Sequence, residues 1–139
     1  MAQTVQDFMT PSPRTLDART SIQEAAQVMR DEDIGDVLVT EAGAIAGIVT
    51  DRDISVRAVA EAKAPKETAI GEIASRDLVS VSPADSLDEV IAMMRDKAIR
   101  RIPVVDGNRP VGILSLGDLA MARDPQSVLA DVSAAPANN

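Results

Sequence analysis

Two segments of the sequence carry a hydroxyl and a carboxylate at the same spacing. Thr50 and Asp53 lie in "GIVTDRDI", and Ser115 and Asp118 lie in "GILSLGDL". An ionised carboxylate accepts hydrogen bonds from two neighbouring hydroxyls, such as those of a ribose, and the backbone N–H groups at a helix start favour an anion. Ser or Thr followed by an acid is also the ordinary pattern of a helix N-cap. The spacing therefore supports a ligand site and a helix cap, and the two do not exclude each other.

Three arginines accompany these segments. Arg100 and Arg101 precede the strand candidate "IPVVD", where they could cap the end of the preceding helix, pair with Asp96 or Glu89, or serve a ligand. Arg52 stands between two acidic residues, either as a ligand contact or as a solvated surface residue. Both interpretations stay open for all three side chains.

The composition excludes several kinds of chemistry. The 139 residues include no histidine, cysteine, tryptophan or tyrosine, and Phe8 is the only aromatic residue. Cys–His and Ser–His catalysis, disulfides and zinc sites with nitrogen or sulfur ligands are therefore impossible within this chain. The acids at 31, 33, 51 and 53 lack EF-hand spacing, so we interpret them as solvated carboxylates and expect no metal site.

Charge and hydropathy restrict the expected partners. The net charge is −8, and the chain has neither a basic run nor aromatic residues to stack on bases, so nucleic-acid binding is not expected. The apolar stretches are too short to cross a bilayer, and residues 1–20 lack the features of a signal peptide. We expect a soluble cytoplasmic protein with no membrane partner.

The chain contains an internal repeat. A shift of 65 positions places "MRD" at 29–31 on "MRD" at 94–96, and it places Asp53 on Asp118. The register holds without a gap from residue 5 to residue 54. The chain is therefore two copies of one unit.

Each copy begins with an amphipathic helix. "TSIQEAAQVMRDE" and "SLDEVIAMMRDK" carry apolar residues at helical spacing. Each opens with a Ser-x-x-Glu capping box, at Ser21 and at Ser86, although Thr20 or Asp85 could be the true cap. The methionines on these stripes are expected in the core or in a dimer contact, and they are Met29, Met93 and Met94.

Short β-rich runs follow each of these helices. They are "DVLVT" and "AIAGIVT" in the first copy and "RIPVVD" and "PVGILS" in the second, and their polar junctions predict hairpins. A second helix is expected from about Asp51 and from about Leu116. Before each first helix lies a strand candidate, "RTLD" or "LVSV", which follows a helical turn in "TVQDFM" or "TAIGEIA". Each copy therefore reads as β-α-β-β-α.

This pattern predicts an α+β fold in which neither copy stands alone. About 50 residues with one apolar sheet face bury too little surface, so the copies should pack sheet to sheet with pseudo-two-fold symmetry. Both copies also carry more apolar helix surface than one small core needs, which favours a homodimer. The expected organisation is a first repeat at 5–59, a connector at 60–69, a second repeat at 70–124 and a C-terminal tail at 125–139. We expect the tail to be flexible, and the alternative for part of it is a short helix at 127–132.

The tandem segments "GDVLVTEAGAIAGIVTDRDI" and "IRRIPVVDGNRPVGILSLGDL" resemble a pair of cystathionine β-synthase (CBS) domains. The resemblance covers roughly residues 5–124 and rests on two motifs: hydrophobic-Pro-Val-Val-Asp, and Gly-Ile-hydrophobic-[Ser/Thr]-x-x-Asp in both copies. The chain is similar to the stand-alone CBS-pair proteins of bacteria and archaea, including the family of the mycobacterial hypoxic response protein.

The resemblance implies a flat homodimer that binds adenine nucleotides (AMP, ADP, ATP or S-adenosylmethionine) in two clefts between the repeats. In that family the motif Asp takes the ribose hydroxyls, and basic residues before the hydrophobic-Pro pair reach phosphate. One implied cleft combines Thr50, Arg52 and Asp53 with Ser80, Ile102 and Pro103. The other combines Ser115, Asp118, Arg100 and Arg101 with Thr15 and Asp36.

The first copy departs from the family pattern at two places. Leu38 stands where the second copy has Pro103, and Asp36 stands where the second copy has Arg101. Asp36 would repel a phosphate. We therefore expect the cleft that contains Ser115 to be the better phosphate site.

These features predict a non-enzymatic regulatory module that transmits nucleotide occupancy to an unknown target protein as a change in conformation or dimer packing. The alternative is a structural or protein-interaction dimer with degenerate clefts and no nucleotide, which Leu38, Asp36 and the lack of an aromatic residue to stack adenine favour. An enzyme is the third hypothesis, but only scattered carboxylates are available as a general base or as metal ligands.

Overall fold

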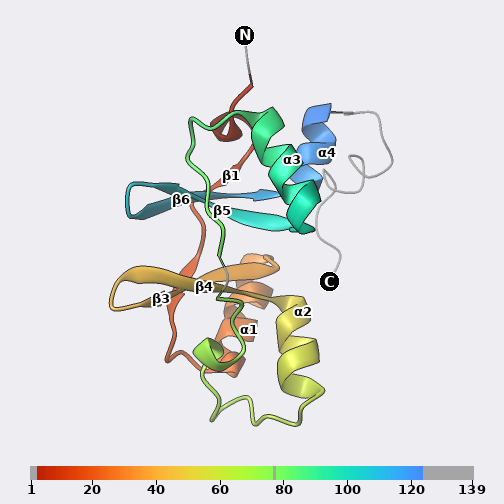
Figure 1. The fold of residues 1–139 in the computed structure, drawn as a ribbon. Coiled ribbons are helices and arrows are strands. Elements are labelled where there is room, and N and C mark those ends of the chain that lie inside the picture. The colour runs from red at the N-terminus through yellow and green to blue at the C-terminus, as the bar shows by residue number, and fades with distance from the viewer. Residues whose placement is uncertain (1–2, 77, 124–139) are drawn as a thin grey trace. The chain divides into compact units, whose positions relative to one another are not determined.

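A computed structural model describes residues 3–76 and 78–123 of the chain (Figure 1). The chain forms two compact units. The continuous unit is Arg14–Leu78, and the composite unit combines Met1–Pro13 with Val79–Asn139.

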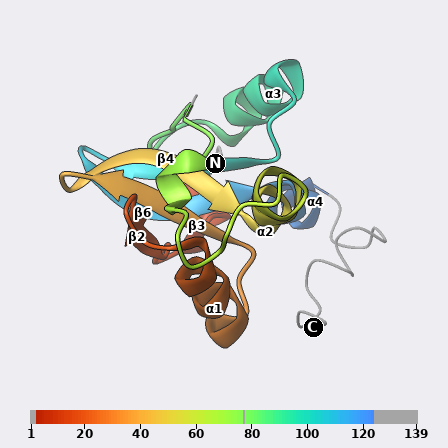
Figure 2. The ribbon, with the colours of Figure 1, turned by 90° about the horizontal axis from the view of Figure 1, so that it is seen from below.

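The continuous unit is a three-stranded sheet with helices on one face (Figure 1). The strand order is β2-β3-β4, with β2 parallel to β3 and β3 antiparallel to β4. Figure 2, seen from below, shows α1 and the helix that begins at α2 in front of this sheet. The elements are β2 (Thr15–Asp17), α1 (Ile22–Glu32), β3 (Asp36–Glu41), β4 (Ala44–Thr50), α2 (Asp51–Asp53), η2 (Ile54–Val59) and η3 (Ile70–Glu72).

The composite unit has the same plan. Its sheet has the order β1-β6-β5, in which both pairs are antiparallel, and α3 and α4 lie on the same face of it (Figure 1). The elements are η1 (Val5–Asp7), β1 (Thr10–Pro11), α3 (Leu87–Lys97), β5 (Arg101–Asp106), β6 (Arg109–Ser115) and α4 (Leu116–Arg123). The predicted helices, hairpins and leading helical turns are therefore present in both repeats.

The N-terminal segment belongs to the composite unit, together with the second repeat. The Val5 N–H donates to the Asp85 carbonyl over 3.0 Å, and the Leu87 N–H donates to the Gln3 carbonyl over 3.1 Å. A few residues later, β1 pairs with β6. The leading turn of the first repeat therefore completes the fold of the second.

The segment that leads the second repeat does the same for the first. The Ile22 N–H donates to the Thr68 carbonyl over 2.9 Å, and the Ile70 N–H donates to the Thr20 carbonyl over 2.8 Å. Ser75 then forms an antiparallel bridge to β4, at the position that β1 takes on β6. The repeat in the sequence and the compact unit in space are therefore different pieces of chain.

Each unit has its own apolar core, and one residue of the exchanged turn lies at its centre. These residues are Val5 in the composite unit and Ile70 in the continuous unit, and both are fully buried. The composite core consists of Val5, Val81, Leu87, Val90, Met94, Ile102, Val104, Leu114 and Leu119. The continuous core consists of Ile22, Ala25, Met29, Val37, Val39, Val49, Ala58, Ile70 and Ile73. Met29 and Met94 are therefore core residues, and Met93 packs against the composite core.

The first strand differs between the two repeats for a chemical reason. In the continuous unit, the Leu38 N–H donates to the Arg14 carbonyl over 2.8 Å and extends the parallel pairing of β2 with β3. Pro103 occupies the equivalent position in β5 and has no N–H to donate. The strand predicted in "LVSV" is accordingly reduced to a single parallel bridge between Val81 and Val104.

The first helix of each repeat begins at the predicted serine, but the caps differ. Ser21 is the N-cap of α1, and its hydroxyl accepts the Glu24 N–H over 3.1 Å. Ser86 is the N-cap of α3 without a side-chain capping bond, so the capping box predicted there is wrong. The carboxylate of the preceding Asp85 instead closes a turn by accepting the Ser82 N–H over 2.8 Å.

The second helix of the first repeat widens soon after it begins. It starts as α2 and continues as the π-helical η2, in which the Ala60 N–H donates to the Ser55 carbonyl over 3.0 Å. Among the described residues, no helix is long and apolar enough to cross a membrane. The predicted tail at 125–139 and its helical alternative at 127–132 lie outside the described residues.

Candidate functional site

In the composite unit, Ser115 and Asp118 form a closed pair where β6 meets α4. The Asp118 N–H donates to Ser115 Oγ over 3.1 Å, and the Ser115 N–H donates to Asp118 Oδ2 over 2.9 Å. This reciprocal capping box fixes both side chains at the helix start. The predicted capping role is confirmed, and Asp118 remains partly exposed.

The two predicted arginines lie at the same junction. Arg101 begins β5 and is the cross-strand partner of Ser115. The Arg100 carbonyl accepts the Leu116 N–H over 2.9 Å, which ties the start of α4 to the start of β5. The guanidinium of Arg101 therefore belongs to a residue directly beside the Ser115–Asp118 pair, in the same unit.

In the continuous unit, Thr50 and Asp53 repeat this geometry where β4 meets α2. The Asp53 N–H donates to Thr50 Oγ1 over 3.1 Å, and the Thr50 N–H donates to Asp53 Oδ2 over 2.9 Å. The Asp51 N–H donates to the Gly35 carbonyl over 3.0 Å, and this bond is equivalent to the one from Leu116 to Arg100 in the composite unit. The capping role is confirmed here too, but Asp53 is buried, with 8% of its surface exposed.

A buried carboxylate needs a partner, and Arg57 supplies it. Arg57 Nε lies 3.7 Å from Asp53 Oδ1, and Arg57 Nη1 donates to the Ile73 carbonyl over 3.3 Å. Arg57 is a site residue that our reading of the sequence missed. Its position four residues after Asp53 on a helix is the signal that could have identified it.

The other predicted residues of the first repeat are spread over the continuous unit. Asp36 begins β3 and is the cross-strand partner of Thr50, so it takes the place that Arg101 has beside Ser115. Thr15 lies in β2 opposite Leu38. Arg52 is exposed, and its backbone N–H donates to Asp51 Oδ1 over 2.8 Å.

The remaining predicted residues belong to the composite unit. Ser80 is exposed and precedes the bridge at Val81, whereas Ile102 and Pro103 are buried in β5. Each unit therefore brings together a hydroxyl, a carboxylate and one charged residue of the neighbouring strand. That charge is Arg101 in the composite unit and Asp36 in the continuous unit.

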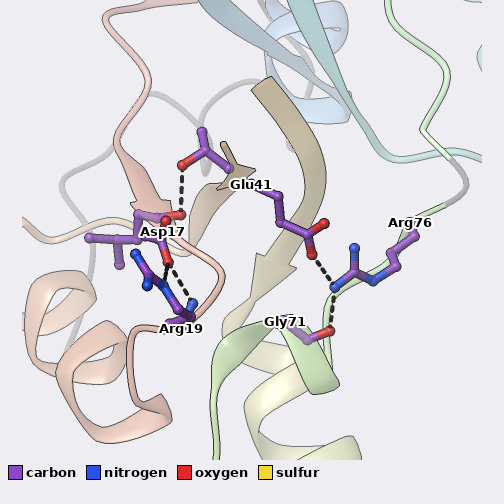
Figure 3. A network of polar contacts seen from close by, with 7 residues as sticks. Asp17, Arg19, Glu41, Gly71 and Arg76 are labelled. Carbon is purple, nitrogen blue, oxygen red and sulfur yellow. Dashed lines mark hydrogen bonds and ion pairs between the residues drawn. The ribbon is translucent and has the colours of Figure 1, made fainter. Parts of the chain in front are cut away.

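A second group of polar contacts in the continuous unit involves Asp17, Arg19, Glu41, Gly71 and Arg76 (Figure 3). Arg76 Nη2 lies 2.7 Å from Glu41 Oε1 and donates to the Gly71 carbonyl over 3.0 Å, so it ties η3 to the hairpin of β3 and β4. The backbone N–H of Arg19 and its side chain hold the pKa of Asp17 below its usual value. Among the described residues, no cluster of three or more acidic side chains is arranged to hold a metal ion.

The sequence matches one family model twice. The CBS domain model matches residues 5–58 and 70–125. The CBS domain-containing protein YhcV of Bacillus subtilis is 41% identical over 117 residues, which cover 84% of this chain and 83% of that protein. Hypoxic response protein 1 of Mycobacterium tuberculosis is 30% identical over 118 residues, which cover 84% of this chain and 82% of that protein.

Solved structures show the same similarity. The structure of hypoxic response protein I with two coordinated zinc ions matches with a TM-score of 0.74 at 30% identity, over 85% of this chain and 97% of that one. The CBS domain pair of protein MJ0100, in complex with 5′-methylthioadenosine and S-adenosyl-L-methionine, matches with a TM-score of 0.79 at 27% identity, over 91% of this chain and 100% of that one. The predicted α+β fold with tandem CBS repeats is confirmed, and the chain belongs to the CBS domain family.

Proposed function

We propose that this protein is a non-catalytic regulatory module that binds an adenosyl ligand, such as AMP, ADP, ATP or S-adenosylmethionine. The observation that carries the proposal is the junction of β6 with α4, where Ser115, Asp118 and the neighbouring Arg101 lie together. The related CBS pair of MJ0100, which binds 5′-methylthioadenosine and S-adenosylmethionine, supports the class of ligand.

The chemistry of this junction suits a nucleoside with a charged 5′ group. Asp118 uses Oδ2 to accept the Ser115 N–H, and the carboxylate has further lone pairs for the hydroxyls of a ribose. An arginine at the start of the neighbouring strand attracts a phosphate, because guanidinium and phosphate match in charge and geometry. In the continuous unit, Asp36 holds the equivalent place and would repel a phosphate. The composite unit is therefore our first choice for the phosphorylated ligands.

Binding regulates when it changes the balance between two states of the protein. A ligand shifts that balance by no more than the difference between its affinities for the two states. Exposed apolar side chains, Val56 and Val59 on η2 and Leu116 on α4, support a homodimer as the assembly in which such a change is transmitted to a target protein.

Thermal denaturation with each of AMP, ADP, ATP, S-adenosylmethionine and 5′-methylthioadenosine tests the proposal. A ligand at a hundredfold excess over its Kd should stabilise the protein by about 2.7 kcal/mol. Asp118→Asn keeps a carbonyl oxygen for the Ser115 N–H but removes the negative charge, so we expect affinity to fall about 10- to 100-fold. Sedimentation of the same samples reports whether the ligand alters the assembly.

Asp106→Asn is the matched control, because Asp106 is an exposed acid at the end of β5 in the same unit. This variant should bind like the unchanged protein. If none of the five compounds stabilises the protein at millimolar concentration, the adenosyl proposal is wrong. The structural or protein-interaction dimer without a nucleotide ligand is then the better description.

A further inference from the structure

The two strand-to-helix junctions share one scaffold. Both capping boxes have the same two distances, 2.9 Å and 3.1 Å. Both helix starts are tied by a backbone hydrogen bond to the residue before the neighbouring strand. A difference in binding between the two junctions must therefore arise from the side chains around them.

One such difference stands four residues after each motif aspartate. The first repeat has Arg57 there, and the second repeat has Ala122. Arg57 contacts Asp53 Oδ1 at 3.7 Å, while the Thr50 N–H occupies Asp53 Oδ2 at 2.9 Å. One oxygen of Asp53 therefore accepts a backbone hydrogen bond, and the other faces a guanidinium at ion-pair distance. An alanine at the equivalent position can supply neither charge nor a side-chain donor to Asp118.

The contact between Arg57 and Asp53 is held in place from a second side. Arg57 Nη1 also donates to the carbonyl of Ile73, a buried core residue that follows η3. The Asp53 side chain is only 11% exposed and the Arg57 side chain is 51% exposed, so water reaches this ion pair from the arginine side only. A ribose hydroxyl that approaches Asp53 Oδ1 would therefore have to compete with the positive charge of Arg57.

We propose that Arg57 is a specificity-determining residue: it serves as a built-in counter-ion for Asp53 and restricts binding of an adenosyl ligand to the junction of Ser115 and Asp118. This inference rests on the proposed function, and it adds that only the junction of Ser115 and Asp118 is available to the ligand. Each chain of the unchanged protein should therefore bind one ligand molecule. Removing the counter-ion frees the carboxylate of Asp53 for the hydroxyls of a second ligand.

The probe should be 5′-methylthioadenosine, because it has the two ribose hydroxyls and no phosphate for Asp36 to repel. Equilibrium dialysis of the full chain counts the bound molecules. We expect one site per chain in the unchanged protein and a second site in Arg57→Ala. Arg57→Gln can keep a donor for the Ile73 carbonyl but carries no charge, so it should also gain the second site. Arg30→Ala removes an exposed arginine of α1 in the same unit, outside the predicted site, and should keep one site.

The reciprocal change is made in the second repeat. Ala122→Arg places an arginine four residues after Asp118 in α4, and arginine has a favourable helix propensity. We expect the affinity of the Ser115–Asp118 junction for 5′-methylthioadenosine to fall by about tenfold or more, as for loss of a charged hydrogen bond. Asp118→Asn in the Arg57→Ala background should then leave only the new site.

The outcomes separate this inference from the proposed function. If the unchanged protein does not bind the probe, the choice of adenosyl ligand fails, and Arg57→Ala should then gain no site either. If the unchanged protein binds one molecule and neither Arg57 variant gains a second, Arg57 is not the determinant. Two equal sites in the unchanged protein would also overturn the inference, because Arg57 would then not restrict Asp53.

Discussion

Asp17 ends β2, and two groups of Arg19 reach the same carboxylate oxygen (Figure 3). The Arg19 backbone N–H donates to Asp17 Oδ1 over 2.8 Å, and Arg19 Nε donates to it over 3.0 Å. Both interactions favour the ionised form, so the pKa of Asp17 lies below its usual value, and the backbone N–H is the largest cause. The bend after β2 is therefore coupled to the charge of one side chain.

This coupling predicts a small dependence of stability on pH. Because the folded protein has the lower pKa, Asp17 stabilises it at pH values above about 3.9, and this stabilisation is lost as the pH falls through the folded value. An NMR titration of the Asp17 carboxyl should give a pKa below the ordinary aspartate value. Arg19→Ala should leave part of the shift, since it keeps the backbone N–H, which is the largest cause. Complete return to the ordinary value in this variant would show that the guanidinium is the main cause instead.

At the residue scale, local spacing predicted the paired motifs but not all of their partners. Ser115 with Asp118 and Thr50 with Asp53 are sequence neighbours, and a helix start forces them together. The ion pair of Asp53 with Arg57 follows from helical spacing and was overlooked in favour of Arg52, which stands beside the motif. The bond from Arg57 to the Ile73 carbonyl could not be predicted, because it depends on where a distant helical turn packs.

At the element scale, the end of α3 shows how a single residue type can strain a helix terminus. The C-cap of α3 is Ala98, whose φ of 54° lies in the left-handed region, and the Ala98 N–H donates to carbonyls of the last turn. Glycine is the usual residue at such a position because it has no Cβ to clash. A helix that ends on alanine in this conformation therefore carries a local strain.

Ala98→Gly should relieve this strain. We expect the free energy of unfolding to rise by about 0.5–1 kcal/mol, since the cost of the left-handed conformation exceeds the entropy that glycine gains in the unfolded chain. Urea denaturation measures the change. Ala92→Gly, in the interior of the same helix, should act in the opposite direction by about 0.5–1 kcal/mol. A loss of stability in both variants would contradict the expected strain at Ala98.

Element types were predictable from the sequence, whereas their exact lengths were not. Apolar spacing identified α1, α3 and both hairpins, because each pattern fits only one regular structure. The first strand of the second repeat shrank to a bridge because Pro103 removes a donor that the periodicity does not report. The π-helical η2 gave no signal either, since its apolar residues also fit an ordinary α-helix.

At the scale of the whole molecule, the repeat predicted two similar folds but not how the chain builds them. A shift of 65 positions states which residues are alike, and both repeats indeed use equivalent bonds. The shift does not indicate whether the leading turn of each repeat packs on the sheet of its own repeat or on the sheet of the other. The leading turns are exchanged, so Val5 is in the core with Leu87 and Ile70 is in the core with Ile22. Only long-range packing decides this.

Because the leading turns are swapped between the repeats, a cavity made at Val5 should loosen the second repeat, which is distant in the sequence. Val5 is fully buried in the composite core, so Val5→Ala should cost about 2 kcal/mol through lost burial and a residual cavity. Hydrogen exchange followed by mass spectrometry should then show faster exchange in peptides from 79–123, while peptides from 14–76 change little. Ile70→Ala, at the equivalent position of the continuous core, should produce the reverse pattern at a cost of about 2–5 kcal/mol.

Lys63→Ala is the control for these two variants, because Lys63 is exposed and belongs to neither core. It should leave the exchange of both units close to that of the unchanged protein. If Val5→Ala instead loosened residues 14–59, the N-terminal turn would stabilise its own repeat, and the composite unit would be the wrong description. Because each unit depends on a turn contributed by the other repeat, we expect that the two repeats cannot be separated at the connector without destabilising both.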